Sequence, residues 1–272
     1  MKKSKRFLLC LILIFFILSC RSSPGDSFDN LKTAFIDWYF RYNPVESTKF
    51  NISGYNGDYK SYSISVINEY NADLSRFLIE LSQIDITKLS NESSIDYKIL
   101  YRFIEKHKYI NDVHKPWEWN LLWVTKQIYE GLYFIAEHTS LNMDSKVESI
   151  NSRLKNIPHI LDESKINLVY NSKIHSAYAI EYLNNLKLLL NNLPLYINSD
   201  NVTLDEIDKN IKICIKSIDE YIYWINTEVN NYEKINFPLN LELFDVGFNY
   251  SVGTNYNYNS VYEFANKKII SI

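Results

Sequence analysis

TLDEIDKNIKICIKSIDEYIYWINTEVNN, residues 203–231, is the stretch of this chain that indicates the fold class most directly. Its apolar residues recur at intervals of three and four, which is the spacing of one face of an α-helix: Ile211, Cys214, Ile215, Ile218, Tyr221, Ile222 and Ile225. Thr203 and Glu206 have the spacing of a capping box, so we predict a helix that begins there and continues to about Asn231. A helix of this length with one apolar face is typical of a bundle or solenoid.

The same periodicity recurs on both sides of this stretch. It covers residues 28–42, 64–81, 94–112, 174–190 and 260–272. In the third of these, Ser93 and Asp96 form a candidate capping pair, and Ile95 and Ile99 are predicted to lie on the buried side. Gly and Pro are rare, at six each, which disfavours a turn-rich β fold. We predict an all-α fold: an irregular array of long amphipathic helices in one domain, residues 28–272.

Three interruptions are expected between these helices. Residues 43–58, which contain two glycines and a proline, are predicted to form a loop. Pro158 is predicted to start or interrupt a helix, because proline lacks the N–H that a helix interior needs. The stretch 247–259 is predicted to loop before the final helix.

The N-terminus has the order of an export signal. Four basic residues precede an apolar run over residues 7–18, and Ser19-Cys20 follows. This arrangement is similar to the lipobox of bacterial lipoproteins, in which Cys20 is lipidated. We therefore predict a signal peptide over residues 1–19, a lipidated tether over residues 20–27 and a location in the cell envelope, lipid-anchored to a membrane and facing periplasm or exterior. A permanent transmembrane helix and an ordinary secretory signal are the alternatives.

The net charge and the cysteine content limit which classes of partner this chain can have. Removal of residues 1–19 takes away four basic and no acidic residues, so the formal net charge falls from −3 to −7. An acidic chain argues against a nucleic-acid partner and against electrostatic membrane binding, which leaves the lipid as the membrane anchor. Cys10 lies in the signal, so Cys214 would be the single cysteine of the domain, and its place on an apolar stripe predicts a buried side chain.

No complete catalytic or metal-binding motif is present in the sequence. A helical zinc site needs two histidines four residues apart, and no histidine here has such a partner. The nearest substitutes are His114 with Glu118 and His159 with Glu163, and neither pair has a third ligand in sequence. We therefore predict no catalytic residue, no metal ligand and no cofactor within this chain.

The most distinctive local feature is a cluster of aromatic residues between residues 117 and 133. Its members are Trp117, Trp119, Trp123, Tyr129 and Tyr133. Such rings could form a groove that binds a peptide, a glycan or a partner protein. Their helical spacing also fits packing in the core, and the sequence leaves both interpretations open.

A series of landmarks is similar in order and spacing to the N-terminal half of the bacterial domain-of-unknown-function 885 family. They are Asn43-Pro44, Gly54, Asp58, Leu81, Ile84, Asp85, Leu89, Asp96-Tyr97, Leu100, Trp117, Arg153-Leu154, Ile157-Pro158, Leu161, Phe237-Pro238 and Glu242-Leu243-Phe244. Members of that family resemble helical zinc metallopeptidases whose His-Glu-x-x-His motif lies in the C-terminal half. The resemblance covers residues 28–270 and implies a fold that is incomplete relative to the full domain and inactive alone.

The same resemblance implies zinc for the full-length family and a missing C-terminal half, or a partner protein, for this chain. The chain stops inside an apolar run, as a truncated product would. A free-standing lipoprotein that binds its ligand through the aromatic groove is the alternative. A carboxylate-based enzyme is a third possibility, which no motif supports.

Overall fold

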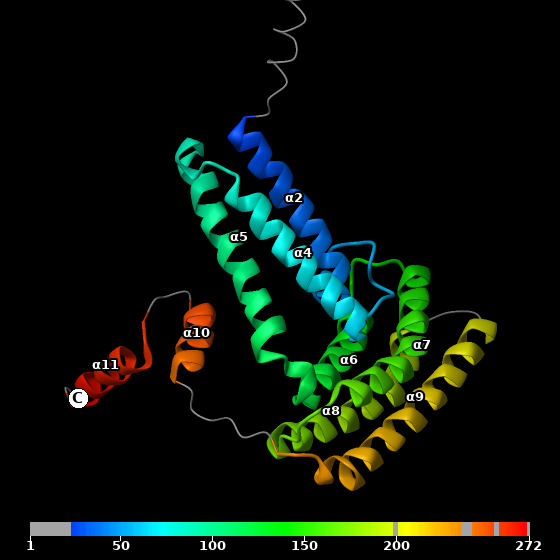
Figure 1. Ribbon diagram of the computed structural model, residues 1–272. Helices are drawn as coiled ribbons and strands as arrows, with labels where there is room; N and C mark the ends of the chain where they lie inside the picture. Colours follow the sequence, from blue (N-terminus) through cyan, green and yellow to red (C-terminus); the bar gives the residue numbers. More distant parts are fainter. Residues whose placement is uncertain (1–22, 198–200, 235–240, 253–255, 271–272) are drawn as a thin grey trace, which may run out of the picture.

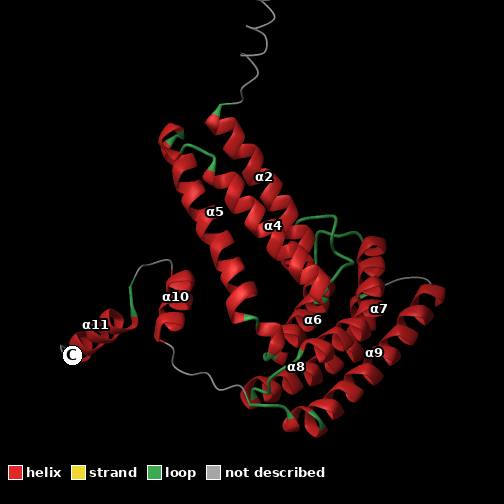
Figure 2. Cartoon of the chain, viewed as in Figure 1, coloured by secondary structure: helices red, strands yellow, loops and turns green. Residues whose placement is uncertain are grey.

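The computed structural model describes residues 23–197, 201–234, 241–252 and 256–270 (Figure 1). Within these ranges every regular element is helical and no strand is present (Figure 2), so the all-α prediction is confirmed. None of the helices in this part of the chain has both the length and the hydrophobicity to span a bilayer. The signal peptide 1–19 and Cys20 lie outside the described residues.

Three long helices form a first unit with an aromatic core. They are α2 (Pro24–Tyr42), α4 (Ile64–Ser82) and α5 (Asn91–Tyr109). Their buried residues include Phe28, Phe35, Trp38, Tyr70 and Phe77. Helix α2 starts inside the segment that was predicted as a tether, because Ser23 and Asp26 cap it reciprocally and Pro24 suits the first helical position.

Helix α5 differs from its prediction in start and in buried face. Its N-cap is Ser90, whose hydroxyl accepts the N–H of Ser93, so the predicted Ser93–Asp96 cap is wrong. Ile95 and Ile99 are about 60% exposed, whereas Leu100 and Ile104 point into the core. Both faces carry apolar residues, so periodicity alone did not determine which one the other helices would cover.

Four helices form a second unit with an aliphatic core. They are α6 (Leu121–Ala136), α7 (Met143–Asn167), α8 (Lys173–Asn192) and α9 (Asn201–Thr227). Pro158 does not interrupt α7. The carbonyl of Leu154, which a proline at 158 leaves without its helical N–H, accepts instead from the buried Cys214 thiol of α9 at 3.1 Å.

Three further boundaries differ from those predicted. Helix α9 starts at Asn201, so Thr203 lies inside it and is not its cap. The predicted loop 43–58 begins with the short helix α3 (Pro44–Lys49). Helix α10 (Leu241–Val252) includes the first part of the predicted loop 247–259, and α11 (Tyr258–Ile270) follows it. Figure 1 shows α10 beside α5, with α11 extending away from the main body.

Candidate functional site

The segment between α2 and α4 joins the two units, and one buried arginine of α7 holds it. The Arg153 side chain is fully buried. Its guanidinium donates hydrogen bonds to the carbonyls of Asp58, Pro44 and Gly131 and to the Thr48 hydroxyl. Burial lowers the pKa of Arg153, and this ring of acceptors offsets part of the cost of removing its charge from water. Arg153 therefore ties the connecting segment to α6 and α7.

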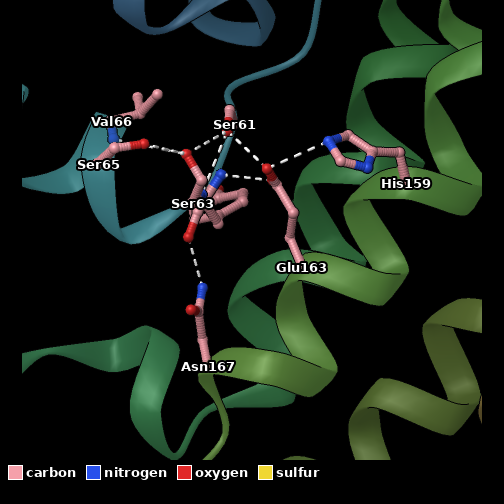
Figure 3. Close-up of polar contacts among 8 residues, drawn as sticks. Ser61, Ser63, Ser65, Val66, His159, Glu163 and Asn167 are labelled. Atoms are coloured by element: carbon pink, nitrogen blue, oxygen red, sulfur yellow. Dashed lines mark hydrogen bonds and ion pairs between the residues drawn. The ribbon is translucent and has the colours of Figure 1, made fainter.

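Two side chains one turn apart on α7 bind both backbone groups of Tyr62. The Glu163 carboxylate accepts the Tyr62 N–H at 2.7 Å, and the Asn167 amide donates to the Tyr62 carbonyl at 2.5 Å. The Ser61 hydroxyl donates to the other Glu163 oxygen at 2.8 Å, and the exposed His159 ring lies 3.3 Å from that same oxygen (Figure 3). These contacts hold the Tyr62 ring in the core of the second unit.

The two histidine–glutamate pairs of the sequence have other partners in the fold. Both oxygens of Glu163 already hold the connecting segment, beside His159. The Glu118 carboxylate lies 3.6 Å from the Lys115 amine, with His114 four residues before Glu118. Within the described ranges, no three His, Cys, Asp or Glu side chains are arranged to hold a metal ion. The zinc that the family resemblance implies therefore does not fit the described residues.

Two of the three tryptophans of the predicted groove are buried and do not lie with its tyrosines. Trp117 and Trp119 are each 7% exposed. The Trp119 indole donates to the His114 carbonyl at 2.9 Å, and its ring packs edge-on against the rings of His114 and His175. Trp123, near the start of α6, is 36% exposed. Trp117 and Trp119 thus pack in the interior and do not face solvent.

The tyrosines lie on the surface along the line where α6 meets α8. The Tyr129 and Tyr133 rings are stacked, with centroids 5.9 Å apart and planes 8° from parallel. Tyr182 of α8 meets Tyr129 edge-on at 5.7 Å. Tyr196 lies just beyond α8, and the Glu137 carboxylate raises the pKa of its hydroxyl. We call these four tyrosines the tyrosine cluster; its flat rings, hydroxyls and nearby carboxylate could stack on a sugar or hold a peptide.

Comparison with known proteins supports the fold. No family model matches the chain, and no curated protein matches it significantly. A solved structure, described as that of "a putative lipoprotein of unknown function from Shewanella oneidensis", is similar to it with a TM-score of 0.79 and 18% identity. The two proteins share a fold. The match covers 89% of this chain and 45% of that chain, so this chain spans less than half of the Shewanella protein.

These comparisons give no support to membership of the 885 family or to peptidase activity. Sequence reasoning also missed Tyr182 and Tyr196. Both were visible as tyrosines near the predicted helix 174–190, but their place beside Tyr129 depends on α6 and α8 packing together. Arg153 was noted only as a landmark, although an arginine among apolar helical positions could have suggested a buried role.

Proposed function

We propose that this chain is a lipoprotein of the cell envelope, anchored through Cys20, whose helical domain acts as one half of a larger helical protein. The observation that carries the proposal is the shared fold with the Shewanella protein, of which this chain matches less than half. The signal-like residues 1–19 followed by Cys20 support the anchor. The zinc centre implied by the 885 family would belong to the other half, and this chain would be inactive alone.

The surface of α10 and α11 supports a packing partner. Exposed apolar side chains gather on these helices and between them: Val252, Tyr256, Tyr262, Phe264, Ile269 and Ile270. An apolar surface formed by these side chains would be a site where another polypeptide packs. Helix α10 already contacts α5 through the Tyr109 and Tyr250 rings at 5.5 Å. The other half of the larger protein, packed on α10 and α11, would therefore extend the first unit.

The anchor is tested by metabolic labelling with a palmitate analogue in a bacterial host. We expect label in the wild-type chain and in the Cys10→Ser variant, whose changed residue lies in the removed signal. Cys20→Ser should lose the label and leave the membrane fraction. Label retained in Cys20→Ser would disprove lipidation at this residue.

The half-domain proposal is tested on purified residues 21–272. We expect self-association in light scattering and binding of a hydrophobic dye, both reduced by Phe264→Ser on α11. Ile166→Ser is the matched control, because Ile166 is 81% exposed on α7 and lies outside the α10–α11 surface. A monodisperse protein that melts cooperatively and binds no dye would count against the proposal.

The tyrosine cluster favours a second function, binding of a glycan or a peptide by a self-standing lipoprotein. The supporting observation is the stacked pair of Tyr129 and the 40% exposed Tyr133. Calorimetric titration with cell-wall oligosaccharides and with peptides should detect binding that Tyr133→Ala weakens at least about tenfold, since the loss of one stacking ring is worth about 1.4 kcal/mol. Tyr223→Ala is the control, because Tyr223 is 69% exposed on α9. Equal affinities in the two variants would exclude the cluster as the site.

A further inference from the structure

The residue proposed to carry the lipid lies close to the first helix in the sequence. Three residues, 21–23, separate Cys20 from Pro24, where α2 begins. An extended chain advances at most about 3.6 Å per residue, so the four steps from Cys20 to Pro24 span at most about 14 Å. The reciprocal cap between Ser23 and Asp26 fixes the first turn of α2. A bilayer that takes up the lipid chains therefore lies close to the start of α2.

The connection between α4 and α5 lies beside the start of α2. In the second turn of α2, the Phe28 ring is 5.9 Å from the ring of Tyr97, which lies near the start of α5. The Tyr97 hydroxyl donates to the carbonyl of Leu81, in the last turn of α4, at 3.1 Å. Figure 1 shows this connection at the same end of the first unit as the start of α2. We call the connection, residues 83–90, the α4–α5 turn.

Apolar side chains are exposed on both sides of the α4–α5 turn. Ile79 of α4 is 60% exposed and Ile95 of α5 is 59% exposed, and each lies about one helical turn from the connection. Ile86, within the turn, is part exposed. Moving such side chains from water to an apolar phase is favourable by about 25 cal/mol per Å² of surface. This end of the first unit therefore suits contact with a lipid surface.

The charges of the α4–α5 turn do not oppose such contact. Its two charged residues, Asp85 and Lys88, form an ion pair with 3.1 Å between the carboxylate and the amine. The Asp85 carboxylate also accepts the N–H and the hydroxyl of Thr87, at 3.1 and 2.6 Å. Because the turn is neutral, its contact with lipid does not require anionic headgroups.

The long sides of the first unit are less suited to lie on a membrane. The Asp29 carboxylate is exposed along α2, and the ion pair of Arg76 and Glu80 is about half exposed along α4. One side of α5 is occupied by α10, whose Tyr250 ring packs on the ring of Tyr109. Charged side chains lose hydration when they enter an apolar phase, which is unfavourable. The end of the unit is therefore a better contact surface than its sides.

We propose that the first unit stands on the membrane through the α4–α5 turn, with Ile79, Ile86 and Ile95 in the headgroup region of the bilayer. The proposal rests on the proposed lipidation of Cys20 and gives the anchored domain its orientation. Helices α2 and α4 have 19 residues each, which corresponds to a length of about 28 Å. In this orientation they hold the second unit and its tyrosine cluster away from the lipid.

The test uses the lipidated chain, produced with its own signal in a bacterial host and reconstituted into phosphatidylcholine vesicles. Gln83→Cys, exposed in the α4–α5 turn, carries an environment-sensitive fluorophore, and the native Cys214 is buried. Asn230→Cys, exposed just after α9 in the second unit, is the matched control. Interfacial side chains enter about 5–10 Å into the headgroup–acyl boundary, so lipids with a nitroxide near the headgroup should quench the Gln83→Cys probe by at least about half and the Asn230→Cys probe by less than about a tenth.

Two further variants separate the turn from the anchor. Ile79→Ser combined with Ile95→Ser should lower the quenching of the Gln83→Cys probe at least about twofold, with the palmitate label and vesicle binding retained. Ile174→Ser, 63% exposed on α8, should leave it unchanged. High salt should also leave it unchanged, because the turn is neutral.

The palmitate label of the same samples distinguishes failure of the orientation from failure of the anchor. A labelled, vesicle-bound chain whose two probes are quenched equally would overturn the orientation and leave the anchor intact. A chain without palmitate label would overturn the anchor at Cys20 and this orientation with it.

Discussion

The two helical units of this protein accommodate buried polar groups in different ways. In the aromatic unit of α2, α4 and α5, the Lys60 ammonium lies on a tyrosine face and His107 packs against the rings of Tyr39 and Phe103. In the aliphatic unit of α6–α9, Arg153 and Glu163 are surrounded by hydrogen-bond partners. Ring faces can attract a cation without an acceptor, whereas leucine and isoleucine offer no such compensation.

The largest effect is expected when the hydrogen bonds of Arg153 in the aliphatic unit are removed. Arg153→Met leaves several buried acceptors without a donor, and we expect a loss of about 3–5 kcal/mol in the free energy of unfolding. Urea unfolding followed by circular dichroism measures this loss. Arg76→Met is the control, because Arg76 is half-exposed on α4 and should change stability by less than about 0.5 kcal/mol. A loss below about 1 kcal/mol for Arg153→Met would show that Arg153 does not tie the connecting segment to the second unit.

The second prediction concerns the loss of stability of the aromatic unit in acid. Burial lowers the pKa of His107 to about 3, whereas an unfolded histidine has a pKa of about 6.5, so below pH 6.5 the unfolded chain binds a proton that the folded chain excludes. Stability contributed by neutral His107 is therefore complete above pH 6.5 and decreases as the pH falls towards 3. At pH 5 the loss from this residue should be about 2 kcal/mol.

This acid sensitivity is measured by urea unfolding at pH 7 and pH 5. His107→Asn should lose less stability between the two pH values than the wild type, although it starts from a lower value. His159→Asn is the control, because the His159 side chain is 71% exposed in the aliphatic unit. Parallel profiles for His107→Asn and the wild type would contradict the role given to His107.

The smallest expected effect concerns the proline within α7. Cys214→Ala removes the thiol that donates to the Leu154 carbonyl, and Pro158→Ala restores the N–H that would bind that carbonyl. The cost of Cys214→Ala should therefore fall by about 1 kcal/mol when Pro158→Ala is already present. A double-mutant cycle in urea measures this coupling, and the packing cost of the alanine cancels in it. Additive effects would show that the thiol is only a space-filling group.

The fold class could be predicted from the sequence because helical periodicity is a local property. The stripe around Cys214 is buried as predicted, and the helix 64–81 matches α4 closely. Helix α5 shows the limit: Ile95 and Ile99 are as apolar as the residues that face the core, and their exposure depends on where α2 and α4 lie. The tyrosine cluster was predictable only in its α6 half, because its other two rings, Tyr182 and Tyr196, come 53 and 67 residues after Tyr129 in the sequence.

The sequence by itself determined that this chain is helical and where most of its helices run, because backbone hydrogen bonds and apolar spacing act within one element. The tertiary structure alone decided which aromatic rings are buried, which are exposed and which polar groups meet. Trp119 and Tyr133 look equivalent in the sequence, yet one packs between two histidines and the other faces solvent. The same holds for Lys60, since only the packing of three helices around Tyr70 places its amine on a ring without a carboxylate beside it.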